Sequence, residues 1–239
     1  NTDNDPNRER VTIDRMRERR VDGLILATAR RKDSLIDACQ QSETPLVLIN
    51  RTVDGDGVAC IVTDEALGMK LVVDHLAGLG HRDIAYVGGP NNLSTGYLRN
   101  RGFHQAMRRA DLAPDSDLIV LTDSFTEEPG RRACARLIAG GKPFSAIVAA
   151  NDLLALGCLD AMAESGIRCP RDISITGFND MPFLDRLTPP LTTVRISHYH
   201  MGSRAAETVL DIVQQAELPV QRLLLEPELV IRRSTARPR

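Results

Sequence analysis

The chain has few aromatic residues and few lysines. It lacks tryptophan and contains three tyrosines and five phenylalanines in 239 residues. A nucleic-acid surface built from stacked aromatic rings is therefore not expected. Lys32, Lys70 and Lys142 are the lysines, so the remaining basic residues are arginines. No stretch approaches the ~18 uncharged apolar residues of a membrane-spanning helix, and no signal peptide is visible in the opening NTDNDPNRER.

Excess charge of either sign is also absent. Thirty lysines and arginines stand against 32 aspartates and glutamates, which gives a net charge of −2. This balance excludes a body that holds nucleic acid or anionic lipid by bulk positive charge. Hydrophobic residues make up 42% and charged residues 26%, as in globular domains. The length predicts one or two domains, each with its own core.

Signatures of catalysis and of metal or cofactor binding are missing. There is no GxSxG, HExxH or P-loop, and Gly88-Gly89-Pro90 is not a dinucleotide fingerprint. The DGDG run at 54–57 lacks the closing glutamate of a calcium loop, so it predicts a tight turn. His198 and His200 are two residues apart and would face apart on a helix. We therefore expect no enzymatic activity, no metal site and no cofactor.

The cysteines form no recognisable framework. They are odd in number, widely spaced and without a CxxC: Cys39, Cys60, Cys134, Cys158 and Cys169. This pattern predicts reduced, mostly buried thiols in a cytoplasmic protein, rather than disulfides or a zinc site.

What is present is an alternation of short apolar runs with helical periodicity. Candidate strands lie at 21–27, 45–50, 58–62, 84–87, 118–121, 146–149, 173–176, 191–196, 223–225 and 229–231. Candidate helices lie at 6–20, 32–41, 64–80, 94–109, 127–139, 151–165 and 197–214. Alternation of this kind predicts βαβ units and an α/β fold of parallel sheets covered on both faces.

Polar residues follow the predicted strands. They lie at 28–31, 50–51, 90–99, 123–126, 151–152 and 179–180. Ligands of open parallel sheets bind at the carboxyl ends of the strands. A polar residue in one loop is ordinary, but its recurrence at six strand ends predicts a ligand site rich in groups that bind hydroxyls.

The order and spacing of these segments resemble the effector-binding core of LacI/GalR-type transcriptional regulators. The matching segments are NTDNDPNRER, RRVDGLILA, PLVLINR, VTDEALGMKLVVDHLAGLGHRDIAYVGGP, YLRNRGF, FSAIVAANDLLALGCLDAMAESGI, CPRDISITGFNDMPF, TPPLTTVRI, MGSRAAETVL and LLLEPELVIRRST. Together they cover nearly the whole chain, and the closing PELVIRRST is more typical of the regulators than of their periplasmic relatives.

The resemblance implies two doubly wound parallel-sheet lobes of the type I periplasmic-binding-protein kind, with a ligand cleft between them. The N-terminal lobe would hold 1–63 plus about 194–218, and the C-terminal lobe 64–193 plus about 219–239. The implied function is that of an allosteric, cytoplasmic, homodimeric repressor core that senses a small sugar or sugar derivative. A periplasmic sugar-binding protein of a transporter is the alternative.

The resemblance also implies ligand contacts, carried over residue by residue. They are Asn50, Arg51, Thr95, Arg99, Phe125, Thr126, Asn151, Asn179 and Asp180. Asn179 stands where the regulators usually have an acid, so Arg99 is expected to lack a carboxylate counterion. That slightly favours an anionic ligand, such as a sugar acid or a phosphorylated sugar, over a neutral sugar. Arg99→Ala is expected to abolish the effector response and leave the fold intact.

Regulators of this kind carry a helix-turn-helix headpiece followed by a strand, a helix and a second strand before the position of NTDND. We expect the 239 residues to be a fragment of a longer protein that contacts operator DNA through that headpiece. The first sheet would then lose its first, central strand, and unpaired buried strand edges are costly.

Overall fold

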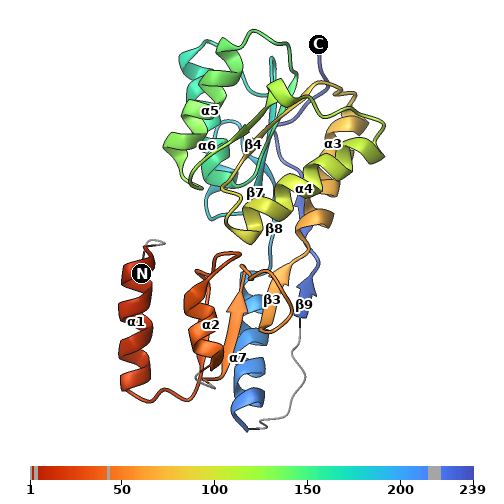
Figure 1. Cartoon of the computed structure of the whole chain (residues 1–239). Coiled ribbons are helices and arrows are strands. Elements are labelled where there is room, and N and C mark those ends of the chain that lie inside the picture. The colour runs from red at the N-terminus through yellow and green to blue at the C-terminus, as the bar shows by residue number, and fades with distance from the viewer. Residues whose placement is uncertain (1, 3–4, 42–43, 215–221) are drawn as a thin grey trace. The chain divides into compact units, whose positions relative to one another are not determined.

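The computed structural model describes residues 2, 5–41, 44–214 and 222–239. These divide into two compact units (Figure 1). The first unit combines Asn1–Val62 with Ser197–Leu225, and the second combines Thr63–Ile196 with Glu226–Arg239. Among the described helices, none has the length and apolar character needed to cross a membrane.

The first unit contains a four-stranded sheet in the order β1-β2-β3-β9. Its strands are β1 (Leu24–Leu26), β2 (Leu46–Ile49), β3 (Ala59–Thr63) and β9 (Arg222–Leu225). Its helices are α1 (Pro6–Glu18), α2 (Ser34–Gln41) and α7 (His198–Gln214). Strands β1, β2 and β3 are parallel. Leu24 pairs directly with Leu46 in the ladder between β1 and β2.

Both faces of the sheet are buried at β2, which explains why this strand is apolar throughout. Leu48 of β2 packs in a cluster with Ile13 of α1 and Ile36 of α2. Its neighbour Val47 points to the opposite face and packs with Met201 and Ala205 of α7. The side-chain alternation of a strand thus divides β2 between two helical layers.

Strand β9 corrects the expected lobe assignment of 219–239. Arg222–Leu225 joins the first sheet, and the second unit resumes at Glu226. The physical reason is the alternation of β9, because Leu223 and Leu225 pack against the α7 cluster while Leu224 is exposed. Residues 219–221 and the boundary expected near 218 lie outside the described residues.

The second unit contains a six-stranded sheet in the order β10-β8-β7-β6-β4-β5. Its strands are β4 (Ile84–Gly88), β5 (Ile119–Leu121), β6 (Ala146–Ala149), β7 (Ser174–Asn179), β8 (Thr192–Arg195) and β10 (Glu228–Val230). Neighbouring strands run parallel except β10, which pairs antiparallel with β8. The predicted α/β class with parallel sheets is confirmed.

Two pairs of helices cover the two faces of this sheet (Figure 1). They are α3 (Glu65–Leu79) with α4 (Ser94–Arg109), and α5 (Glu127–Ala139) with α6 (Asp152–Glu164). One continuous core joins them to the strands, and it includes the fully buried Tyr86, Phe103 and Phe178. Four of the five cysteines are buried, Cys169 is half-buried, and all five are free thiols.

Gly157 brings α5 and α6 close together, and these helices carry Thr126 and Asn151 at their N-termini. A Cβ at Gly157 would collide with the carbonyl oxygen of Glu127 and the amide nitrogen of Arg131. We predict that Gly157→Ala destabilises the protein by roughly 2–3 kcal/mol, because backbone must move to make room. Urea unfolding measures this effect. Gly78→Ala is the matched control: its Cβ meets nothing within 4 Å, and it should add up to about 1 kcal/mol.

Candidate functional site

A buried ion pair lies near the carboxyl ends of the second sheet's strands. Arg99 is in the second turn of α4, and Glu65 is in the first turn of α3. The Arg99 Nε donates to Glu65 Oε2 at 2.6 Å, and Nη2 donates to Oε1 at 3.2 Å. Both side chains are nearly inaccessible, at 3% and 2% exposure. The pair is therefore bidentate and shielded from solvent, which strengthens each hydrogen bond.

The guanidinium of Arg99 is held from other directions too. Its carbon lies 3.8 Å from the ring centroid of Phe178 and 6.0 Å from that of Phe125. Nη1 donates to the carbonyl oxygen of Ala150, at the end of β6, at 2.7 Å. These contacts use three of the five N–H groups of an arginine. Two N–H groups remain to donate to a ligand oxygen.

Glu65 overturns the expectation that Arg99 lacks a carboxylate counterion. Burial raises the pKa of the Glu65 carboxyl, while the charge and hydrogen bonds of Arg99 lower it. Arg99 therefore has a carboxylate partner, and the predicted preference for an anionic ligand loses its basis. Sequence reasoning missed Glu65 because it follows the helix cap Asp64 and has the character of an ordinary acidic first turn.

One signal for Glu65 was available in the sequence. Gly102 lies three residues after Arg99, and a Cβ there would approach the Cα of Ala66 to 3.1 Å. Its glycine lets α3 and α4 pack closely, and this places the residue before Ala66 beside Arg99. Gly102 is therefore a sequence signal that α4 packs closely on another element, and the structure identifies that element as α3.

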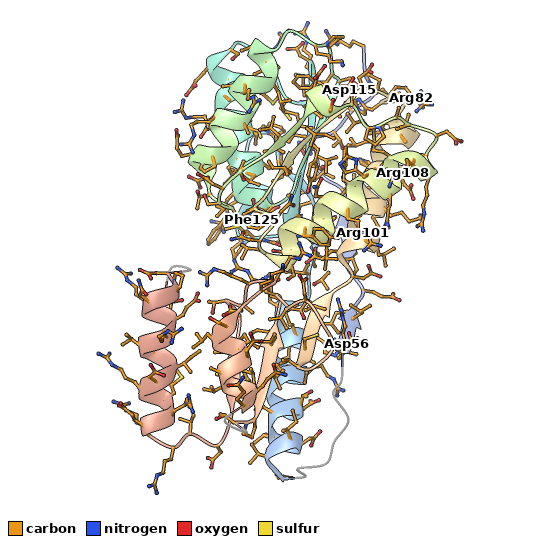
Figure 2. The ribbon with its side chains drawn as sticks, viewed as in Figure 1. Asp56, Arg82, Arg101, Arg108, Asp115 and Phe125 are labelled. Carbon is orange, nitrogen blue, oxygen red and sulfur yellow. The ribbon has the colours of Figure 1, made fainter. Side chains whose placement is uncertain are left out.

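Asn151 links two of the loops at this edge. Its Oδ1 accepts from the amide of Leu154 at 2.9 Å and caps α6, and its Nδ2 donates to the carbonyl oxygen of Phe125 at 3.1 Å. Phe125, labelled in Figure 2, lies on the loop between β5 and α5. Its ring covers Gly89, where a Cβ would collide with it. Asn151 thus positions the aromatic ring that neighbours Arg99.

Asp152, the next residue, fixes the loop after β7. It accepts from the hydroxyl of Thr193 at 2.6 Å and from the amide of Met181 at 2.9 Å. Strand β7 runs three residues past its predicted end, and a Cβ at Gly177 would collide with the Asp152 carboxylate. Gly177 is therefore needed inside the strand for this close approach, rather than as a strand terminator.

Asp180 is already engaged by two arginines. Its Oδ2 accepts from Arg195 Nε at 2.8 Å, and its Oδ1 accepts from Arg232 Nη2 at 2.7 Å. Asn179 and Asp180 both have left-handed backbones, with φ of 117° and 55°. These ion pairs and the Asp152 bond hold a loop conformation that is unfavourable for residues with side chains. Asp180 is thus better placed to hold the loop than to meet a ligand.

The remaining predicted contacts are more scattered. Thr95 is buried in the first turn of α4, one turn before Arg99. Thr126 is exposed at the N-cap of α5, with its Oγ1 at 2.9 Å from Ser124 Oγ. Asn50 and Arg51 belong to the first unit and follow β2, where Asn50 has a φ of 61°. The structure therefore brings Arg99, Phe125 and Asn151 together, with Thr95 one turn from Arg99.

Metal ligands do not gather in the described residues, where no group of three or more histidine, cysteine, aspartate or glutamate side chains could hold an ion. His198 and His200 lie in the first turn of α7, and both are exposed.

Asp152 predicts a pH dependence of stability. Burial is the main cause that raises the pKa of Asp152 to about 6 from 3.8. Between these values the folded state binds more protons than the unfolded state, so stability falls as pH rises from about 4 to about 6, by roughly 2–3 kcal/mol. In Asp152→Asn the amide oxygen can accept from the Met181 amide while the amide nitrogen donates to the Thr193 hydroxyl oxygen, and the variant should remove this fall. Urea unfolding at pH 4.5 and 7 checks it, with Asp160→Asn, on an exposed position of the same helix, as control.

The chain is similar in sequence to a known domain family and to curated repressors. Residues 73–235 match the family of the periplasmic binding protein-like domain. The repressor PurR of Haemophilus influenzae is 31% identical over 239 residues, which cover 98% of this chain and 70% of that protein.

Two solved structures are similar over nearly the whole chain. The complex of the transcriptional regulator CelR with cellobiose has a TM-score of 0.88 and 28% identity, covering 95% of this chain and 70% of that one. The lac repressor dimer bound to operator and the anti-inducer ONPF has a TM-score of 0.86 and 26% identity, covering 97% and 80%.

Proposed function

This chain belongs to the LacI-type family of transcriptional regulators with a periplasmic binding protein-like domain, and from that premise we propose that it senses a small sugar-like effector. In this proposal the chain also forms the homodimer that presents two DNA-binding headpieces to a two-fold operator. The resemblance to a repressor dimer on its operator supports the dimer. The net charge of −2 agrees with DNA contact by a headpiece rather than by this body.

The observation that carries the ligand proposal is the Arg99–Glu65 pair. Its charges compensate each other, and two N–H groups of Arg99 remain for acceptors. The half-buried Phe125 supplies apolar ring surface beside the guanidinium, whose carbon also lies over the buried ring of Phe178. Donors next to aromatic rings suit a neutral sugar, which carries hydroxyls at its edge and C–H groups on its faces. Asn50, Arg51, Thr95 and the other carried-over positions stay proposed contacts.

The effector would act through a difference in its affinity for two states of the protein. Such coupling is typically about 1–3 kcal/mol. A ligand that binds both states equally would leave operator affinity unchanged. Binding and regulation are therefore separate measurements.

A thermal-shift screen of neutral mono- and disaccharides, followed by calorimetry of each hit, tests the ligand class. A bound effector at 100 times its Kd should add about 2.7 kcal/mol of stability. Arg99→Met should abolish that gain, and Arg131→Met, at a more exposed arginine of α5, should keep it. If a broad panel gives no hit with the wild-type protein, a neutral sugar effector is ruled out. Sedimentation should give twice 26.3 kDa for the dimer.

A further inference from the structure

We propose that Glu65 sets the charge of the effector: it makes the Arg99 site accept neutral ligands and reject anionic ones of the same shape. The inference deepens the proposed function and rests on it, because it concerns the same site. Without Glu65, a buried arginine at strand ends would be a receptor for carboxylate or phosphate groups.

The geometry gives Glu65 this role directly. Both carboxylate oxygens face the guanidinium, and the carboxylate is 2% exposed. A charge so deeply buried is little screened by salt. An anionic group that reached the two remaining N–H groups of Arg99 would approach the Glu65 carboxylate in a poorly screened environment. A neutral hydroxyl oxygen accepts the same hydrogen bonds without that repulsion.

Arg99 is also unable to leave Glu65 at low cost. Phe178 stacks on the guanidinium at 3.8 Å, and the Ala150 carbonyl oxygen accepts from Nη1 at 2.7 Å. Swinging the arginine toward an anion would break both contacts and leave a buried carboxylate without its partner. The pair therefore acts as one neutral unit that offers donors but no net positive charge.

The neighbouring charges do not restore a positive site. Asp152 is fully buried beside this edge and adds negative charge when it is ionised. Arg195 and Arg232 are both bonded to Asp180. Glu65 thus decides the sign of the potential that a ligand meets at Arg99.

The experiment compares wild-type protein, Glu65→Gln and the control Glu164→Gln. Glu164 is an exposed glutamate of the same unit, paired with Arg131. The probes are inorganic phosphate and two matched pairs, glucose with glucuronate and galactose with galacturonate. Affinities are measured by calorimetry and thermal shift at pH 7.5 in anion-poor buffer, on the full chain.

Wild-type protein and Glu164→Gln should bind phosphate and the uronates weakly or not at all. Glu65→Gln should bind them at least about tenfold more tightly, because a like charge no longer lies beside the anion. If Glu65→Gln binds phosphate no better than the wild type, the inference is overturned. Tight binding of uronates by the wild-type protein would overturn it as well.

The outcomes of this experiment distinguish failure of the role of Glu65 from failure of the proposed function. If no neutral sugar binds any of the three proteins but Glu65→Gln gains phosphate, the sugar effector fails and the role of Glu65 stands. If neutral sugars bind and Glu65→Gln still rejects anions, the proposed function stands and the role of Glu65 fails. Should Glu65→Gln not fold in anion-poor buffer, added phosphate should restore its circular dichroism spectrum, and failure of that rescue would also overturn the inference.

Discussion

Arg99→Ala should lose ligand binding and also about 3–5 kcal/mol of folding stability, because removal of one member of a buried ion pair leaves the other uncompensated. The loss of stability replaces the expectation that this variant keeps its fold intact. Glu65 would remain buried without its Arg99 partner, and the Ala150 carbonyl oxygen would lose its Nη1 donor. Urea unfolding measures the stability, and calorimetry with a hit from the sugar screen measures the binding.

A second substitution, at Glu65, should restore the folding stability that is lost when Arg99 is replaced, but it should not restore ligand binding. In Arg99→Met combined with Glu65→Gln no unpaired charge is buried, and replacement of a buried ion pair by neutral groups is often close to neutral in stability. The four proteins of this double-mutant cycle give the coupling energy directly. Arg131→Ala is the control, since its ion pairs are solvent-exposed and should contribute less than about 1 kcal/mol. An unchanged midpoint for Arg99→Ala alone would show that the pair contributes nothing.

The parts of this fold that sequence alone predicted are those decided by local periodicity. The predicted ranges 94–109, 127–139 and 146–149 agree with the bounds of α4, α5 and β6. In each, the apolar residues follow one regular period, and a polar or glycine-rich segment stands at the ends. In such segments the local pattern is enough to predict the type of secondary structure and its bounds.

The features that sequence did not predict depend on contacts between distant residues. Glu65 and Arg99 are 34 positions apart, and their pairing follows from the close packing of α3 and α4. Strand β9 has the pattern of any short strand, and its place in the first sheet follows from packing on α7. Asp180 lies at a position typical of a ligand contact, yet its carboxylate accepts a hydrogen bond from Arg232, which is 52 residues later in the chain. Periodicity reports which face is buried but not which partner buries it.

Deletion of the C-terminal segment from residue 234 onward should also have a large effect on stability, because residues 234–236 are bonded to buried groups. Ser234 is fully buried; its hydroxyl donates to the Ile175 carbonyl oxygen at 2.6 Å and accepts from the Thr192 amide at 2.8 Å. The Ser234 carbonyl oxygen accepts from the Ile175 amide at 2.8 Å. Ala236 exchanges hydrogen bonds with the Ser174 hydroxyl. This segment therefore satisfies backbone groups of β7 and β8 that water cannot reach.

Two histidines also bond to this C-terminal segment: His75, which lies in α3, and His81, which follows α3. The carbonyl oxygen of Ala236 accepts from His81 Nε2 at 2.8 Å, so Nδ1 is the nitrogen that accepts from the Ser145 hydroxyl at 2.8 Å. His75 Nε2 lies 2.9 Å from the Thr235 hydroxyl oxygen. Burial is the main cause that lowers the pKa of both imidazoles.

Truncation after Arg233 should cost more than about 4 kcal/mol, since several buried polar groups would each lose a partner worth about 1–3 kcal/mol. Ser234→Ala is the milder variant and should cost about 1–3 kcal/mol, because the Thr192 amide and the Ile175 carbonyl oxygen lose their hydroxyl partner. Urea unfolding at pH 7.5 compares both with the wild type. A truncated protein with the wild-type midpoint would show that the segment is dispensable.

The two histidines should also make stability depend on pH near neutrality. With lowered pKa values in the folded state, His75 and His81 bind fewer protons there than in the unfolded chain as pH falls below about 6.5. Stability therefore falls on acidification through that range and is fully retained above it. His81→Gln should flatten the slope between pH 6.5 and 5.5. Asp152 and Glu65 act in the opposite direction, and the effect of Asp152 extends up to about pH 6. If His81→Gln has the same slope as the wild type within this window, His81 is excluded as a cause of the fall in stability.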